Sequence, residues 1–230
     1  MKLAIMQPYL FPYIGYFQLV NTVNKFIFYD DVNFIKNGWI NRNRILIQGK
    51  AHYITIQLKN ASSFKPICEI EFNDNTKQII KSIYYNYKRA PFFHEVFKII
   101  EGALIAKTNK ISELAINSIK SVCEYLKIET QFEISSIYYH ESINLTKENR
   151  IIKICKKNNA DTYINPIGGI ELYNKDDFKK QGIELKFLKT KDIIYKQFDN
   201  EFVPNLSIID VMMFNSKDEI KKMLNEYELL

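Results

Sequence analysis

Two short apolar runs near the N-terminus carry hydrophobic side chains at consecutive positions instead of alternate ones. Residues 2–6 and 26–30 have this pattern, which is typical of strands buried on both faces in a parallel sheet. Residues 16–24 lie between them and are long enough for a crossover helix. We therefore predict a right-handed βαβ unit at the start of the chain.

The hydrophobic spacing changes twice after this unit. Residues 45–48 and 52–58 alternate about Gly49–Lys50, which predicts a hairpin, and a further strand is expected at 67–72. Apolar residues then recur mostly at helical intervals. The predicted helices cover residues 76–88, 92–106, 112–126, 147–158, 207–214 and 217–227, with one helical turn at 178–181, and short strands are expected at 132–135, 161–165 and 183–188.

This order of elements predicts an α/β fold with a mostly parallel central sheet, a helical insertion and a small antiparallel patch. One domain is expected to span residues 1–230, because the late strands need a sheet to join. Residues 76–130 are candidates for a helical subdomain within it.

The formal net charge of +6 comes from 32 Lys and Arg against 26 Asp and Glu, spread along the chain. We find no basic helix, no aromatic RNA-binding motif and no zinc finger, so we expect no nucleic-acid partner. A modest positive net charge is equally consistent with binding of a small molecule that carries a phosphate.

The sequence shows no targeting or membrane segment. Pro8 and Pro12 interrupt the apolar start, and no run approaches the length of a membrane span. Cys68, Cys123 and Cys155 are far apart and form no C-x-x-C pair. They are expected to be buried structural thiols in a reducing compartment. A cytoplasmic location follows.

The run after the first predicted strand is rich in proline and tyrosine. Residues 6–16 hold Pro8, Pro12 and three tyrosines, which disfavours a helix and predicts a stiff loop. Ligands of α/β proteins bind beside the ends of strands and the starts of helices. Gln7 is therefore a candidate for amide contacts to a substrate, and Tyr9 and Tyr13 are candidates for aromatic contacts.

Two carboxylates, Asp30 and Asp31, end the second predicted strand. Adjacent strand residues point to opposite faces, so we expect one carboxylate to reach the ligand and the other to cap a turn. A carboxylate there can bind a sugar hydroxyl or deprotonate an amine. The alternative is a structural strand-end turn. Trp39 follows and can stack on a base or a sugar, or serve as a core anchor.

Positive charge and amides are concentrated in the same stretch. Lys36 is a candidate to hold a phosphate or polarise a carbonyl. Arg42, between Asn41 and Asn43, is suited to bind a diphosphate with two donors. The alternative for these residues, and more so for Arg44, is ordinary surface charge.

The second half of the chain offers weaker candidates. His140, in a predicted polar loop at 135–142, is a candidate base or an exposed loop residue. Gly168 and Gly169 can bring backbone amides close to a phosphate or simply form a turn. The histidines show no metal-ligand spacing, so no metal is expected. The remaining substrate-binding candidates are Ser135, Asn165 and Tyr173.

Seven segments of the chain form a recognisable set: QPYLFPYIGYFQL (residues 7–19), YDDVNFIK (29–36), GWINRN (38–43), YKRAPFF (87–93), ADTYI (160–164), Gly168–Gly169 and LSIID (206–210). Together they resemble the WbqC-like family of bacterial polysaccharide gene clusters. One departure is Asn165–Pro166, where relatives commonly show Ser-Gly before the glycine pair, so a shared hydroxyl role there is not implied.

A second similarity is architectural. The strand, proline loop, glycine, helix and strand at the start resemble pantothenate synthetase and other nucleotidyl-transfer folds. The resemblance implies a Rossmann-like sheet with a nucleotidyltransferase-like βαβ start. The His-x-Gly-His signature of that superfamily is absent, and residues 11–16 read FPYIGY instead, which argues against adenylyl transfer by the usual histidine mechanism.

The WbqC-like resemblance implies acyl or aminoacyl transfer to the amine of a nucleotide-linked amino sugar in O-antigen, capsule or other surface-glycan biosynthesis. In this hypothesis Asp30, Asp31, Lys36 and His140 are the catalytic candidates. The co-substrate is left open between an acyl thioester and ATP, and the partners are a nucleotide sugar and an acyl- or aminoacyl-carrier protein. The alternatives are an ATP-dependent ligase or nucleotidyltransferase-like enzyme, and a non-catalytic sugar-binding partner.

Overall fold

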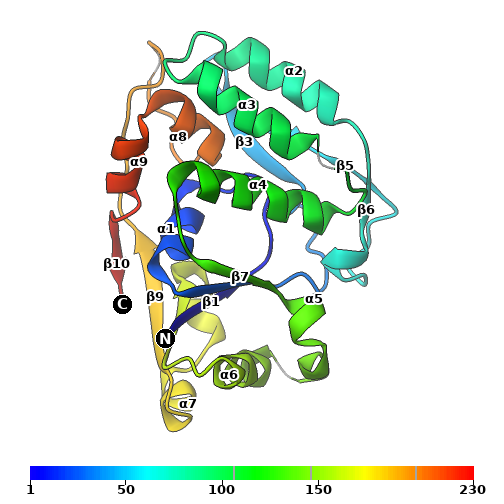
Figure 1. The fold of residues 1–230 in the computed structure, drawn as a ribbon, viewed down its shortest axis with the longest axis vertical. Coiled ribbons are helices and arrows are strands. Elements are labelled where there is room, and N and C mark those ends of the chain that lie inside the picture. Colours follow the sequence, from blue (N-terminus) through cyan, green and yellow to red (C-terminus); the bar gives the residue numbers. More distant parts are fainter. Residues whose placement is uncertain (106, 146, 200) are drawn as a thin grey trace.

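A six-stranded sheet forms the centre of the computed structural model, which describes residues 1–105, 107–145, 147–199 and 201–230 (Figure 1). The strand order is β10-β9-β8-β1-β2-β7, and all neighbours are parallel except β10 and β9. The prediction of a mostly parallel central sheet is confirmed. The strands are β1 (Lys2–Met6), β2 (Lys25–Phe28), β7 (Gln131–Ile134), β8 (Thr162–Pro166), β9 (Glu184–Thr190) and β10 (Tyr227–Leu229).

The order of the parallel strands reverses beside β1. The chain runs from β1 through α1 (Ile14–Thr22) to β2 and then to β7 on one side, and it returns to β8 on the other side of β1. The loops that follow β1 and β8 therefore leave the sheet in opposite directions. In open α/β sheets, such a reversal leaves a crevice at the carboxyl ends of the two strands.

The strands are apolar at consecutive positions because both faces of the sheet are covered. Ala4 and Phe26 face a core cluster that includes α1 and α4 (Ile111–Leu126). Leu3 and Ile27 face a second cluster, formed with α6 (Lys147–Lys157) and α7 (Lys175–Lys180). Figure 1 shows these two helix layers on opposite sides of the sheet.

The helices of the insertion share the larger cluster with the sheet. Ile83, Val96 and Leu114 are buried in the same cluster as Ala4 and Phe26, so this apolar core is continuous from the sheet to the outermost helices. The other helices on this side are α2 (Thr76–Tyr87), α3 (Phe93–Leu104), α8 (Ile208–Phe214) and α9 (Lys217–Met223).

Two antiparallel pairs form the small patch. The predicted hairpin of β3 (Arg42–Ile47) and β4 (Lys50–Thr55) is present, but it turns at Gln48 and Gly49, one residue earlier than predicted, and both residues have positive φ. The second pair joins β5 (Gln57–Lys59) to β6 (Glu71–Asn73).

Residues 67–72 do not form the single strand that we predicted. A 3₁₀ turn, η1 (Ile67–Glu69), comes first, and only then does β6 begin. The cause is local, because the carbonyl of Pro66 accepts the N–H of Glu69 and closes the turn.

The predicted helix at 217–227 is too long. Helix α9 ends at Met223, and the chain enters β10 at Tyr227. The buried Gln18 carboxamide donates to the carbonyls of Met223 and Glu226, at 2.8 and 2.9 Å, and so stabilises this ending.

Two further predictions are corrected near the sheet edge. Residues 135–142 are not a loop but two short helical segments, α5 (Ser135–Tyr138) and η2 (His140–Ser142). Strand β2 ends at Phe28, two residues early. Asp30 and Asp31 leave the sheet there because their carboxylates bind groups on the segment after β7.

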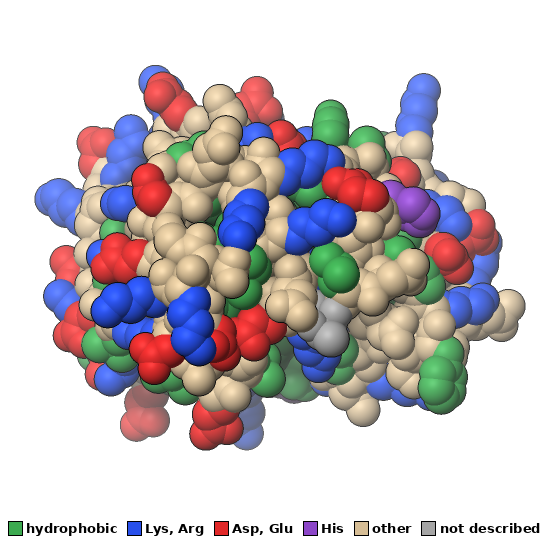
Figure 2. Space-filling model, turned by 90° about the horizontal axis from the view of Figure 1, so that it is seen from below, with side chains coloured by type: hydrophobic (Ala, Val, Ile, Leu, Met, Phe, Trp, Pro, Cys, Tyr) green, Lys and Arg blue, Asp and Glu red, His purple; other side chains and the backbone are tan. Residues whose placement is uncertain are grey.

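Figure 2 shows the face covered by α6 and α7, where basic and acidic side chains are interspersed. Lys157 pairs there with Glu141, and Lys180 with Asp177, each at 2.8 Å. Within the described ranges, none of the helices combines the length and apolar character needed to cross a bilayer.

Candidate functional site

The loop after β1 is held in one conformation by hydrogen bonds from distant elements. Asn43 Nδ2 in β3 donates to the carbonyls of Leu10 and Phe11, at 3.0 and 2.8 Å. The Ser207 hydroxyl donates to the Phe11 carbonyl at 2.7 Å, and the Phe11 N–H donates to Ser118 Oγ at 3.0 Å. Three other parts of the chain therefore fix this loop.

The loop contains a strained residue at its centre. Phe11 is fully buried and has a φ of 40°, in the left-handed region that a bulky side chain rarely adopts. Such strain persists only where the surroundings over-determine it, and it is concentrated at functional sites. The hydrogen bonds at Phe11 supply that constraint.

Beside this loop lies a cavity of about 400 Å³, which we call the aromatic pocket. Tyr9 and Tyr13 come from the loop, and Trp39 from the segment after β2. The Arg44 guanidinium lies 5.6 Å from the Trp39 ring centre. The full lining is Tyr9, Pro12, Tyr13, Trp39, Asn43, Arg44 and Asn205.

Two side chains of the aromatic pocket are electrostatically suited to an anionic ligand. Burial, with a smaller effect of Tyr13, raises the pKa of Tyr9 to about 12, so its phenol remains a hydrogen-bond donor at neutral pH. Arg44 Nη2 donates to the Asn205 carbonyl at 3.0 Å. Its Nε is buried and has no acceptor among the described residues.

Helix α1 begins at the edge of this pocket. Tyr13 is its N-cap and lines the cavity, and no side chain of the described residues caps the helix there. The first N–H groups of a helix have no partner within it and attract anions. Gly15 keeps this end closely packed, since a Cβ at this position would lie 2.5 Å from Thr190 Oγ1 and the Tyr13 ring.

Asp30 and Asp31 lie in a separate buried network. The Ser135 hydroxyl is within hydrogen-bond distance of both carboxylates, at 3.1 and 2.5 Å. Ser136 binds Asp30 through its N–H and its hydroxyl. The two aspartates therefore converge on one segment instead of facing opposite ways, because β2 has already ended before them.

Asp31 forms a buried ion pair with Arg150 of α6, and both side chains are at most 4% exposed. The Arg150 guanidinium also lies over the Tyr29 ring, 4.7 Å from its centre. Burial raises the pKa of Asp30, although hydrogen bonds from Ser136 and Ser135 oppose this. The network joins β2, β7 and α6.

The glycine pair after β8 has a packing role at one position. A Cβ on Gly169 would lie 1.9 Å from Asn165 Nδ2, whereas one on Gly168 would have no atom within 4 Å. The Asn165 carboxamide also accepts from the Tyr163 hydroxyl and donates to the Pro166 carbonyl. Tyr173 follows nearby, and its ring packs edge-on against Tyr163.

The remaining predicted residues are dispersed. Arg42 donates to the carbonyls of Asn37 and Gly38 and stacks on Tyr53, so these donors are already used. Asn41 donates to the Ile56 carbonyl. The structure places Gln7 just after β1, Lys36 on an exposed turn and His140 exposed at the start of η2.

The cysteines form no disulfide. Cys123 and Cys155 are buried as predicted, but Cys68 is partly exposed, in contrast to the prediction. Burial raises the pKa of each thiol, to about 11 for Cys68 and about 12 for the other two. Across the described ranges, no group of three His, Cys, Asp or Glu side chains is placed to bind a metal ion.

The structure thus brings Tyr9, Tyr13, Trp39 and Asn43 together, and leaves Asp30, Asp31 and Ser135 in their own network. Sequence reasoning rated Arg44 below Arg42 and missed Asn205, Ser118 and Ser207. Alternation along β3 puts Arg42 and Arg44 on the same face, so the sequence pattern gave no reason to prefer Arg44.

Comparison with known proteins gives one family match. The WbqC-like protein family matches residues 7–222. The chain is also 28% identical, over 219 residues and 93% of each chain, to the uncharacterised protein Rv1507c of Mycobacterium tuberculosis. No solved structure gives a significant match.

Proposed function

Because the chain belongs to the WbqC-like protein family, we propose that it transfers an acyl or aminoacyl group to the amine of a nucleotide-linked amino sugar. The pathway is surface-glycan biosynthesis, and the location is the cytoplasm. The donor is an acyl thioester, an acyl- or aminoacyl-carrier protein, or an ATP-activated acid.

The observation that carries this proposal is the aromatic pocket at the N-terminus of α1. Trp39 and Tyr9 present aromatic faces, on which a base or a sugar can stack. Arg44 lines the pocket with a guanidinium group, and the N-cap Tyr13 places the N-terminus of α1 at its edge, so both favour a diphosphate. The ligand that combines a base, a diphosphate and a sugar is a nucleotide sugar.

The strand order supports the same proposal. Strands β7, β2, β1, β8 and β9 have the order 3-2-1-4-5 when numbered along the chain as parallel strands, which is a Rossmann-like order. Folds of this order bind nucleotides at the reversal point, where the loop after β1 lies.

In this proposal the two aspartates position the site. Their oxygens are engaged by Ser135, Ser136 and Arg150, so Asp30 and Asp31 act by ordering the segments after β2 and β7. Direct proton transfer by either carboxylate stays a prediction. Its test is turnover by Asp31→Asn, which loses activity without unfolding if that role holds.

Calorimetric titration with a nucleoside diphosphate-amino sugar tests the proposal. We expect binding by the wild type and weakening of about tenfold or more in Arg44→Gln, because a charge-assisted hydrogen bond is lost. Trp39→Leu should weaken binding through lost stacking. The matched control is Arg89→Gln, an exposed arginine outside the pocket lining, which should bind like the wild type.

Three other results would change the conclusion. Binding of ATP with magnesium in place of any nucleotide sugar would favour the ligase or nucleotidyltransferase alternative. Sugar binding with no turnover, for any acyl donor tried, would favour a non-catalytic partner. Equal affinity in Arg44→Gln and wild type would contradict the pocket assignment.

A further inference from the structure

A second cavity, of about 320 Å³, lies on the other side of Tyr13 and Asn205. We call it the strap pocket, because the segment after β9 forms most of its wall. Tyr13 and Asn205 line both this cavity and the aromatic pocket. The two cavities are therefore neighbours that share a boundary at the N-terminus of α1.

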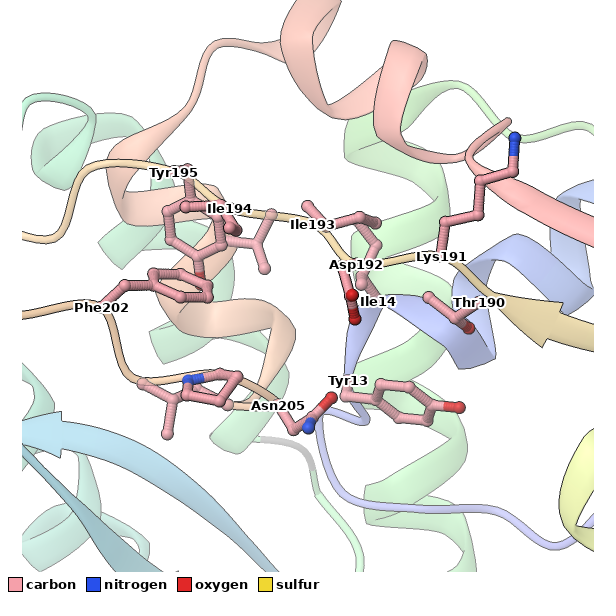
Figure 3. Close-up of a pocket in the computed structure, with 13 residues that line it drawn as sticks. Tyr13, Ile14, Thr190, Lys191, Asp192, Ile193, Ile194, Tyr195, Phe202 and Asn205 are labelled. Carbon is pink, nitrogen blue, oxygen red and sulfur yellow. The ribbon is translucent and has the colours of Figure 1, made fainter.

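The strap pocket has one apolar wall and several polar lining residues. Ile14, Ile193, Phe202 and Val211 contribute hydrocarbon, and Tyr195 contributes an aromatic ring (Figure 3). This wall is preformed. The Tyr195 hydroxyl donates to Asp210 Oδ1 at 2.7 Å, and its ring packs edge-on against Phe202, with ring centres 5.2 Å apart.

One carboxylate, that of the solvent-exposed residue Asp192, borders this cavity. Figure 3 shows the Asp192 side chain directed into the cavity, towards Ile14, while Lys191 extends away from it. Lys191 pairs with Glu226 at 3.8 Å. Among the residues that the structure describes, Asp192 forms no ion pair and accepts no side-chain hydrogen bond.

A carboxylate without a partner beside an apolar wall is suited to a cationic group on a compact ligand. A primary ammonium group supplies both the charge and the donors that Asp192 needs. The Thr190 hydroxyl lines the same cavity and can accept one of the remaining ammonium hydrogens.

We propose that Asp192 selects the amine-bearing substrate, by holding the ammonium group of the sugar in the strap pocket while the nucleotide occupies the aromatic pocket. This inference rests on the proposed function and adds the residue that determines specificity. Tyr13 and Asn205 form the boundary between the two cavities that such a ligand would span.

The test compares two ligands and three proteins. The ligands are a nucleoside diphosphate-amino sugar and the same compound with a hydroxyl in place of the amine. The proteins are the wild type, Asp192→Asn and the control Asp199→Asn. Asp199 lies on the same segment outside the strap pocket, and its fully exposed side chain faces Lys196 at 3.9 Å.

We expect the wild type to bind the amino sugar at least about tenfold more tightly than the hydroxy sugar, as for a charge-assisted hydrogen bond. Asp192→Asn should bind both ligands with similar affinity, and Asp199→Asn should discriminate like the wild type. Circular dichroism and melting temperature check that each variant folds.

The failures are distinguishable. Equal binding of the two ligands by the wild type overturns the role of Asp192 but leaves nucleotide-sugar binding intact. If Asp192→Asn still prefers the amino sugar as strongly as the wild type, the role of Asp192 is also overturned, because another group must then bind the amine. Absence of binding by either ligand overturns the proposed function together with this inference.

Discussion

The carboxamide of Asn43 donates to the carbonyl of Phe11 at 2.8 Å and thereby holds a buried aromatic residue in a left-handed conformation. The same NH₂ group also binds the Leu10 carbonyl, while Asn43 Oδ1 accepts the N–H of Arg44. One side chain in β3 therefore fixes two things. It holds the loop that provides Tyr9 and Tyr13, and it holds the backbone of Arg44.

We predict that Asn43→Asp lowers the free energy of unfolding by about 2–4 kcal/mol and weakens ligand binding. The substitution keeps the acceptor for Arg44 but places a carboxylate against two buried carbonyls; Leu10 loses its side-chain donor, and Phe11 keeps only the Ser207 hydroxyl. Urea denaturation measures the change. The control Asn225→Asp, at an exposed helix end, should change stability by less than about 0.5 kcal/mol. Equal effects in both variants would contradict this account of Asn43.

Because Asp31 and Arg150 form a buried ion pair, the effects of substituting them on the free energy of unfolding should be strongly non-additive. Arg150→Met should cost about 3–5 kcal/mol, because it leaves an unpaired carboxylate in the interior. The double variant Asp31→Leu with Arg150→Met should recover part of that loss. A double-mutant cycle by urea denaturation measures the coupling. Additive effects of the two substitutions would show that the pair is not energetically linked.

The two neighbouring glycines should respond differently to alanine. Gly169→Ala forces the buried Asn165 carboxamide to move and to lose its bonds to Tyr163 and Pro166, at a cost of about 1–3 kcal/mol. Gly168→Ala meets open space and should be neutral or slightly stabilising. Thermal unfolding of the two variants decides the point, and comparable destabilisation would contradict it.

Asp210 predicts a pH dependence of stability. Burial raises its pKa above the ordinary 3.8, although hydrogen bonds from Tyr195, Tyr87 and Gln197 oppose the shift. The folded protein therefore binds this proton more tightly than the unfolded chain. The contribution of Asp210 to stability is then greatest at low pH and falls as pH rises from about 4 through the raised pKa.

The substitution Asp210→Asn removes this titration. The difference in unfolding free energy, wild type minus variant, should decrease as pH rises from about 4 through the raised pKa of the folded state. Urea titrations at several pH values measure this difference. A difference that grows with pH would mean that the pKa of Asp210 is lowered in the folded state instead.

The elements that sequence predicted best are those specified by local pattern. The βαβ start, the hairpin at Gly49 and the helix from Thr76 follow from periodicity and turn residues. The family resemblance is confirmed by the match over residues 7–222. A stiff loop after β1 could also be predicted, because Pro8 and Pro12 restrict the backbone in any fold.

The composition of the site was less predictable, because it depends on tertiary contacts. Asp192 and Asn205 lie in a stretch without periodicity, and only the fold brings them beside Tyr13. Asp30, Asp31 and Ser135 were predicted as site residues from their place at strand ends, but the pairing of Asp31 with Arg150, 119 residues further along the chain, has no local signal.

The bonds that hold Phe11 also determine when the aromatic pocket can form during folding. Ser118 and Ser207 lie 107 and 196 residues away from Phe11 in the chain, so closing this loop requires contacts of very high sequence separation, which form slowly. The pocket is therefore a property of the completed chain. We expect nascent chains that lack α8 to have the βαβ unit without a binding site, so that ligand binding reports global folding.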